Sequence, residues 1–500
     1  MRESKTRRLV ATVVLMMATV GATFATGAQE GETATTMEAP LPVRYVVPDS
    51  PQPELDVVEG AVSEAMQADG LDLTLEVIHI ERTVLDDRLN VMFASGEPFE
   101  LLHIMENRRP STVFINAGQL RPIDDLVDQY FTDSYDRFSE GEWAAGQVNG
   151  VQYTVPAAWK AQTRTGSEAG WIGARIDKLE QYGYNSFPET KDELFDMLAD
   201  LKEQVDNPRA YFWQGAPQAA QVWLNRTHDS YPFFVDYGSE LFYVTEDGRV
   251  ESWIETAEFA ENARFMRRLY EADLIHPDWI TLPPGVESSL GQFALLTALG
   301  TDDPPEAPED EELGFFLRPD TDVYVSIPVL NANGVSTTTE HPETGIQFLN
   351  WLYAERENHD LFLHGIEGRH YERVSDRLRE RVVDSTEQPL YSFRYWQIGY
   401  RPWRMFDPGI HPKSLEYQTS EHPTTTFHLA SAFRFDPTPV EAEYQNVIAE
   451  WDRSILPIKM GNQDYDDAFE NALDRMKDAG LDTVVDEYRE QFDEWYATVQ

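Results

Sequence analysis

A segment past the middle of the chain gathers side chains that could bind a ligand through hydrogen bonds. Residues 360–372 read DLFLHGIEGRHYE and follow a predicted helix. Two glycines, Gly365 and Gly368, allow the backbone to turn away from the helix end with positive φ. The turn would display a carboxylate, a guanidinium, an imidazole and a phenol, contributed by Glu367, Arg369, His370 and Tyr371.

Two interpretations of this loop stay open. In the first, Glu367 or His370 forms hydrogen bonds with ligand hydroxyls. In the second, the loop is a hinge in which Arg369 pairs with Glu372 and Tyr371 is buried. We expect the loop to turn a corner with Arg369 in a structural role, and we keep the other three side chains as candidate binding residues.

The sequence offers no catalytic or metal-binding motif. Its 88 acidic residues place carboxylate pairs throughout the chain, so no acid/base pair is singled out. There is no GxSxG elbow, HExxH helix or phosphate-binding loop. The acidic, proline-rich residues 300–314 do not have EF-hand spacing. We therefore predict a protein that is not an enzyme and has no cofactor or metal, with a glycan-acting enzyme as a minor alternative.

The first residues have the pattern of an export signal. Arg2, Lys5, Arg7 and Arg8 precede the apolar run 9–25, which leads into small residues. We predict a signal peptide over residues 1–28 and a flexible leader over 29–41, the alternative being a membrane anchor. The chain has no cysteine, so it has no disulfide and no lipid-attachment cysteine. We expect an exported protein, periplasmic or extracellular, that is not lipid-anchored.

The charge of the chain is strongly negative. The formal net charge is −48, which repels nucleic acid and anionic lipid. Of the basic residues, 8 are Lys and 32 are Arg. This composition suggests a halophilic protein in a salt-rich or alkaline exterior, where carboxylates keep the surface hydrated and Arg keeps its charge. A bias in genomic composition is the alternative explanation.

Strand and helix patterns alternate at the start of the mature chain. This alternation predicts an α/β domain with a largely parallel sheet. Ligands bind such sheets beyond the carboxyl ends of the strands, which points to the loops around Glu97 and after Met105, including Glu106 and Asn107. The predicted segments are strand 42–48, helix 53–70, strand 71–80, helix 83–98 and strand 99–105.

Six segments in this order resemble the extracellular solute-binding proteins of carbohydrate ABC importers, in particular their larger LipO-like branch. Each is weakly specific, and together they cover nearly the whole mature chain. Two departures are the missing lipid-attachment cysteine and Ala272-Asp273, near which the family usually has a glycine. The segments are LNVMFASGEPFELLHI (89–104), AGQLRPIDDLVDQY (117–130), NGVQYTVP (149–156), FPETKDELFDMLADLKE (187–203), DGRVESWIETAEFAENARFMRRLYEADLIHPD (247–278) and HPETGIQFLNWLYAERENHDLFLHGIEGRHYE (341–372).

The resemblance implies a two-lobed, periplasmic-binding-protein-like α/β fold of type 2 with a hinge. Lobe 1 would comprise residues 42–155 and 312–372, and lobe 2 residues 156–311 and 373–500. A monomer of this family would capture a sugar or oligosaccharide in the interlobe cleft and deliver it to the permease subunits of an ABC importer. A binding protein for a peptide or organic acid, or a surface adhesion module, are the alternatives.

A carbohydrate site needs aromatic faces for the C–H faces of sugar rings and polar side chains for the hydroxyls. Each tryptophan could equally be a core residue. Trp159 and Trp171 flank the predicted lobe crossover, Trp213 lies in a loop with Gly and Pro, and another aromatic segment spans 391–400. The full set of predicted binding residues is Trp159, Trp396, Trp171, Trp213, Tyr395, Glu97, Asn107, Glu367, His370 and Tyr371.

Overall fold

The computed structural model consists of one unit at Met1–Ala39 and a second unit at Pro40–Gln500. The described helices and strands lie in the second unit. Among the described residues, none of the helices is long and apolar enough to span a membrane. The structure describes residues 39–106, 108–157, 172–174, 182–185, 188–204, 224–236, 239–275, 280, 314–316, 323–325, 329, 331–409, 415 and 425–499.

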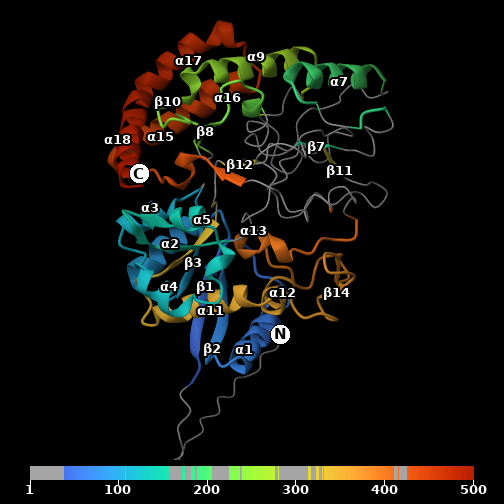
Figure 1. Ribbon diagram of the computed structural model, residues 1–500, viewed down its shortest axis with the longest axis vertical. Coiled ribbons are helices and arrows are strands. Elements are labelled where there is room, and N and C mark those ends of the chain that lie inside the picture. The colour runs from blue at the N-terminus through green and yellow to red at the C-terminus, as the bar shows by residue number, and fades with distance from the viewer. Residues whose placement is uncertain are drawn as a thin grey trace, which may run out of the picture. The chain divides into compact units, whose positions relative to one another are not determined.

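A five-stranded sheet organises the first lobe, in the order β2-β1-β3-β13-β6. The first three strands are parallel, as their alternating and apolar patterns predicted, and β13 runs antiparallel to both of its neighbours. Helix α1 packs along β2 and α11 along β1 (Figure 1). The bounds are β1 Leu41–Val47, β2 Leu73–His79, β3 Leu101–Met105, β13 Asn331–Val335, β6 Thr154–Pro156, α1 Leu55–Ala68, α2 Leu85–Ser95, α4 Asp124–Tyr130, α11 Pro342–Ala354 and α12 Arg356–His364.

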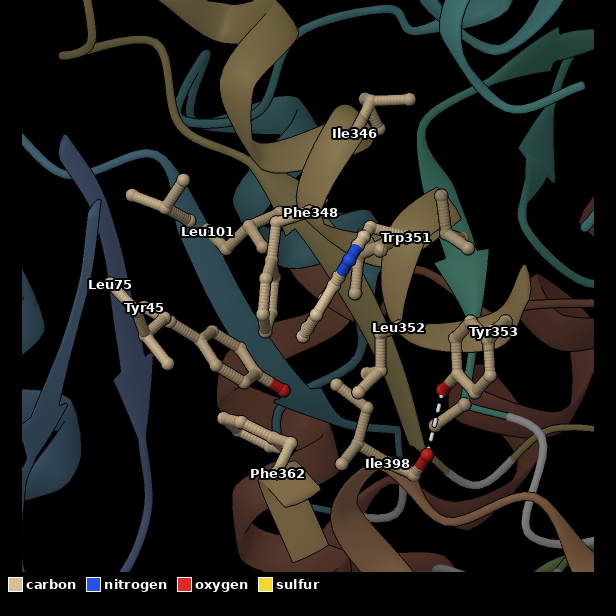
Figure 2. Close-up of a cluster of buried hydrophobic side chains, with 14 of the residues drawn as sticks. Tyr45, Leu75, Leu101, Ile346, Phe348, Trp351, Leu352, Tyr353, Phe362 and Ile398 are labelled. Atoms are coloured by element: carbon tan, nitrogen blue, oxygen red, sulfur yellow. Dashed lines mark hydrogen bonds between the residues drawn. The ribbon is translucent and has the colours of Figure 1, made fainter. Parts of the chain in front are cut away.

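Side chains from distant parts of the sequence form the main core of this lobe (Figure 2). Tyr45 of β1 and Phe348 of α11 lie with their ring centroids 6.3 Å apart. The hydroxyl of Tyr353 donates to the carbonyl oxygen of Ile398 at 2.8 Å. Residues 391–400 supply five buried members of this core. The buried aromatic side chains of this stretch pack in the same core as β1 and α11. The residue bounds predicted for the two lobes, including residue 373 as the point where lobe 2 resumes, stay predictions.

A second lobe is built around the antiparallel sheet β10-β9-β8. Helices α15, α17 and α18 pack on one another, and α18 packs on β10 (Figure 1). The helical character predicted for the last 60 residues is confirmed. The bounds are α7 Lys191–Gln204, β8 Phe233–Val235, β9 Phe242–Thr245, β10 Val250–Ser252, α9 Ala257–Glu271, α15 Glu441–Glu450, a π-helical turn Trp451–Ile455, α16 Leu456–Lys459, α17 Tyr465–Ala479 and α18 Leu481–Val499.

Buried core residues of the first lobe lie between Val43 and Ala157 and between Val335 and Tyr400, and those of the second lobe lie between Leu194 and Ile275 and between Ala430 and Phe492. The described residues also form small two-stranded pairings and short helices. Their bounds are α3 Ser111–Asn116, α5 Glu140–Ala144, β4 Gln147–Val148, β5 Val151–Gln152, β7 Ile172–Ala174, β11 Gly314–Phe316, β12 Val323–Val325, β14 Tyr371–Arg373, β15 Arg379–Arg381, α13 Tyr395–Ile398 and β16 Thr425–Phe427.

Candidate functional site

A pocket of about 680 Å³ is lined by residues from both lobes. This volume lies in the range of sites for small organic ligands, about 300–1,000 Å³. The first lobe contributes the start of α2 and the loop from Glu106 to Val113. The second lobe contributes β8, β9, residues 431–438, α15 and Tyr488 of α18. The pocket therefore lies where the carboxyl end of β3 faces the second lobe.

Glu106 reaches the pocket because β3 ends one residue earlier, at Met105. Its Oε2 accepts a hydrogen bond from the backbone amide of Ser111 at 3.0 Å, at the start of α3. Its side chain is only 5% exposed, and its Oε1 has no hydrogen-bond partner among the residues that the structure describes. A buried carboxylate oxygen without a donor is costly, so this atom is suited to receive a hydrogen bond from a ligand.

Aromatic side chains of the second lobe form one wall. Phe242 of β9 stacks on Tyr488 of α18 with centroids 3.9 Å apart, and Phe435 contacts both rings. Tyr444 of α15 lies at the edge of this cluster, 6.1 Å from Phe435, and keeps part of its surface exposed. Burial raises the pKa of Tyr444 to about 12, so it remains a hydrogen-bond donor at neutral pH. The wall offers apolar faces with a phenolic edge.

Two arginines of the first lobe line the pocket, and both have acidic partners. Arg108 donates to Asp86 at 3.1 Å. Arg109 donates to Asn90 at 3.3 Å, lies 3.9 Å from Asp86 and covers the ring of Phe114 at 4.2 Å. Burial lowers the pKa of Arg109, and Asp86 opposes that shift. These two guanidinium groups therefore hold the start of α2 against the loop after β3.

Arg434 of the pocket lining holds three backbone carbonyl groups in place. It donates to the carbonyl oxygens of Ser431 and Phe433, each at 3.1 Å, and to that of Val329 at 3.2 Å. Its Nε lies 3.7 Å from Oε2 of Glu106, beyond hydrogen-bond distance, and has no hydrogen-bond partner among the described residues. Burial lowers the pKa of Arg434, and Glu106 opposes that shift.

Most of the chain matches the models of known families. A family described as bacterial extracellular solute-binding protein matches residues 56–358, and a domain of unknown function (DUF3502) matches residues 429–497. The chain belongs to the bacterial extracellular solute-binding proteins. The resemblance recognised in the sequence is thereby confirmed, and the second match covers α15, α17 and most of α18 in the lobe that carries the aromatic wall.

Two curated relatives and one solved structure are similar over most of the solute-binding protein. A carbohydrate ABC transporter substrate-binding protein of Streptococcus pneumoniae is 20% identical over 427 residues, 82% of each chain. Lipoprotein LipO of Bacillus subtilis is 21% identical over 387 residues, 71% of this chain and 70% of LipO. The N-glycan transport solute binding protein NgtS of S. pneumoniae has a TM-score of 0.68 at 15% identity, over 92% of this chain and 100% of NgtS. NgtS has also been solved in complex with Man5GlcNAc. The predicted two-lobed fold is confirmed.

The glycine-rich loop of this solute-binding protein turns a corner. Gly365 and Gly368 have φ of 80° and 79°. His370 is fully buried; its Nδ1 accepts from the amide of Ile366 at 2.8 Å and its Nε2 lies 3.0 Å from Glu54. Arg369 pairs with Glu54 at 2.7 Å, so the predicted pairing with Glu372 is wrong.

The remaining described candidates lie away from the pocket lining. Glu367 lies 3.3 Å from Arg373, and Tyr371 is 3% exposed, in agreement with the hinge-loop interpretation. Glu97 pairs with Arg88 on the surface at 2.9 Å. Ligand contacts by the three loop side chains Glu367, His370 and Tyr371, and by Glu97, stay predictions.

Tyr395 and Trp396 belong to α13, which packs on β13. Tyr395 is 7% exposed in the main core. Trp396 is partly exposed, with the guanidinium of Arg82 4.5 Å above its ring and the ring of His103 at 5.5 Å. Neither lines the pocket. Trp159, Trp171, Trp213 and Asn107 lie outside the described residues.

Sequence reasoning located Glu106 but missed the aromatic wall. The rule that ligands bind beyond the carboxyl ends of strands led to the loop after Met105. The local sequence of Tyr444 does not distinguish it from other residues of a helical tail. The segment FRFDPTP (433–439), with alternating aromatic and charged residues before a helix, is the signal that could have suggested Arg434 and Phe435.

Proposed function

We propose that this protein is the exported solute-binding component of an ABC importer and captures a sugar or oligosaccharide in the pocket between its lobes. The observation that carries the proposal is the pairing of an aromatic wall with a buried, unpartnered acceptor and donor, Glu106 Oε1 and Arg434 Nε. Aromatic faces suit the C–H faces of sugar rings, and the acceptor and donor suit hydroxyls, which form both kinds of hydrogen bond. The glycan complex of NgtS supports the same ligand class.

The mechanism is a ligand-dependent shift between arrangements of the lobes. A sugar that contacts Glu106 in one lobe and Tyr444 in the other stabilises the arrangement that offers both contacts. The permease subunits of the importer would recognise that arrangement and receive the sugar. The covalent bonds of the ligand remain unchanged, and hydrolysis of ATP occurs in another subunit, because this chain carries no nucleotide-binding motif.

A peptide or organic acid is the second candidate ligand class. The three arginines of the pocket lining favour it at first sight. However, Arg108 and Arg109 are paired with Asp86, and the NH groups of Arg434 donate to three carbonyl oxygens. A carboxylate binder presents an unengaged arginine fork to its ligand, so the sugar remains the better match.

The setting of this function follows from the composition. We propose a monomer released outside the cytoplasmic membrane after removal of residues 1–28, without a lipid anchor because it has no cysteine. In this respect it would differ from LipO, which is a lipoprotein. The net charge of −48 would maintain hydration of the surface in salt. A melting temperature that falls steadily as NaCl rises would contradict the adaptation to salt.

The test of the function is calorimetric titration of the mature protein with a panel of gluco-, manno-, galacto- and fructo-oligosaccharides in high salt, next to dipeptides and citrate. We expect at least one saccharide to bind with a dissociation constant in the micromolar range or below and to remain intact after incubation. Binding confined to peptides or citrate, or hydrolysis of a saccharide, would refute the proposal.

A further inference from the structure

We propose that the Glu106–Arg434 pair makes the pocket selective for uncharged saccharides and rejects acidic ones, such as uronic-acid oligomers. The inference rests on the proposed function and narrows its substrate class. Two observations support it: Glu106 Oε1 and Arg434 Nε lack hydrogen-bond partners among the described residues, and the charges of the described lining residues around them are net negative.

The geometry of the pair calls for a group that both donates and accepts a hydrogen bond. Within the described part of the chain, Glu106 Oε1 is a buried acceptor without a hydrogen-bond donor, and Arg434 Nε is a buried donor without an acceptor. The carboxylate and the Nε are 3.7 Å apart, too far to bond each other. A hydroxyl can donate to Glu106 and accept from Arg434, so one group of a neutral sugar satisfies both atoms.

A ligand carboxylate can satisfy only half of the pair. Ionised carboxylates accept hydrogen bonds and donate none. Bound to Arg434 Nε, a uronate would place its charge next to Glu106, whose side chain is 5% exposed and therefore weakly screened by solvent. The acceptor Oε1 would remain unsatisfied, and two like charges would face each other in a site of low dielectric constant.

The other charges of the lining do not offset this repulsion. The described residues of the lining include four carboxylates (Asp86, Glu106, Asp236, Glu441) and three guanidinium groups, one negative charge in excess. Asp86 is shared by Arg108 and Arg109. Asp236 accepts from the amides of Ser239, Glu240 and Phe242 and from the Ser239 hydroxyl, so its charge belongs to the β8–β9 turn. The field of the whole chain has the same sign.

The test compares neutral and acidic trimers of the same sugars in the mature protein: mannotriose against trimannuronate, and galactotriose against trigalacturonate, with each pair titrated by calorimetry at pH 7.5. For whichever sugar pair binds, we expect the dissociation constant of the neutral trimer to be at least tenfold lower than that of the acidic trimer. Equal or tighter binding of the acidic member would overturn the selectivity and leave sugar capture standing. Binding of neither pair would overturn the selectivity, and the proposed function as well if the wider panel also failed.

The variant Glu106→Gln tests whether the pair causes the selectivity. The amide keeps an acceptor oxygen but removes the charge, so we expect neutral trimers to bind about threefold to tenfold more weakly and acidic trimers more tightly. The control Glu64→Gln removes one carboxylate from the exposed surface of α1, outside the pocket lining, and should leave both affinities unchanged. An unchanged preference in folded Glu106→Gln would overturn the proposal. If that variant does not fold, the salt dependence of binding to the wild-type protein provides the test. Acidic trimers should bind more tightly as the NaCl concentration rises, and neutral trimers should not.

Discussion

Replacement of Tyr444 by alanine removes one of the two partly exposed aromatic rings of the pocket wall, the other being Phe435. The residue lines the pocket from α15, with its ring 6.1 Å from that of Phe435, and it is partly exposed while Phe242 and Tyr488 are buried. A sugar can therefore cover this ring, which also carries a hydroxyl that the neighbouring Phe435 lacks. An aromatic side chain offers roughly 200 Å² of surface, of which one ring face is about a quarter. At about 25 cal/mol per Å², covering that face contributes about 1.3 kcal/mol.

Tyr444→Ala should therefore bind a saccharide about tenfold more weakly than the wild type. The assay is calorimetric titration with the tightest saccharide of the panel, together with thermal unfolding to verify the fold. Tyr444→Phe keeps the ring face, and we expect its affinity to stay within about threefold, the value of one neutral hydrogen bond. Tyr135→Ala removes an exposed tyrosine that lies outside the pocket lining and should bind normally. Wild-type affinity in folded Tyr444→Ala would refute stacking at this position.

Two further predictions concern the sheet that positions the pocket. Glu100 is fully buried and accepts hydrogen bonds from the amide, Nε and NH2 of Arg44 and from the Thr339 hydroxyl, at 2.8–3.0 Å. Glu100→Gln should therefore lower the free energy of unfolding, measured in urea, by about 3 kcal/mol. A loss equal to that of the surface variant Glu97→Gln would contradict this structural role. Burial lowers the pKa of His103 to about 3, so below pH 6.5 the unfolded chain binds a proton that the folded protein does not, and stability falls as pH decreases. His103→Gln, which can still bond to Asn331, should therefore lose about 2–3 kcal/mol less than the wild type between pH 7 and 4.5. If the free energy of unfolding fell equally with pH in the wild type and in His103→Gln, this histidine would not be the cause of the loss of stability.

The strands and helices of the first lobe could be predicted because their patterns are local. Alternation in β2 and the helical period of α1 are set by which face meets the core, and both are legible in the sequence. The same rule led to Glu106, because the end of a strand fixes the place of the next residue. These features need no knowledge of distant partners.

The pocket itself could not be predicted, because its second wall combines β8 and β9 with residues more than 300 positions beyond Glu106 in the sequence. Arg434 and Tyr444 meet Glu106 only through the packing of α15 and α18. Trp396 shows the converse: a tryptophan in an aromatic segment suits a sugar site and a core equally, and here its ring lies under Arg82 beside His103. The burial of His370 against Glu54 likewise cannot be inferred from its neighbours in the chain.

Capture of the sugar between the lobes is the central claim, and a distance across the pocket tests it most directly. The chain has no cysteine, so Val91→Cys and Asn446→Cys would be the only labelling sites. Both residues are exposed, and they adjoin Asn90 and Gln445 of the pocket lining. Pulsed electron paramagnetic resonance on the doubly spin-labelled protein should show a shorter distance when a saccharide that binds in calorimetry is added. An unchanged distance at saturating saccharide would contradict capture between the lobes.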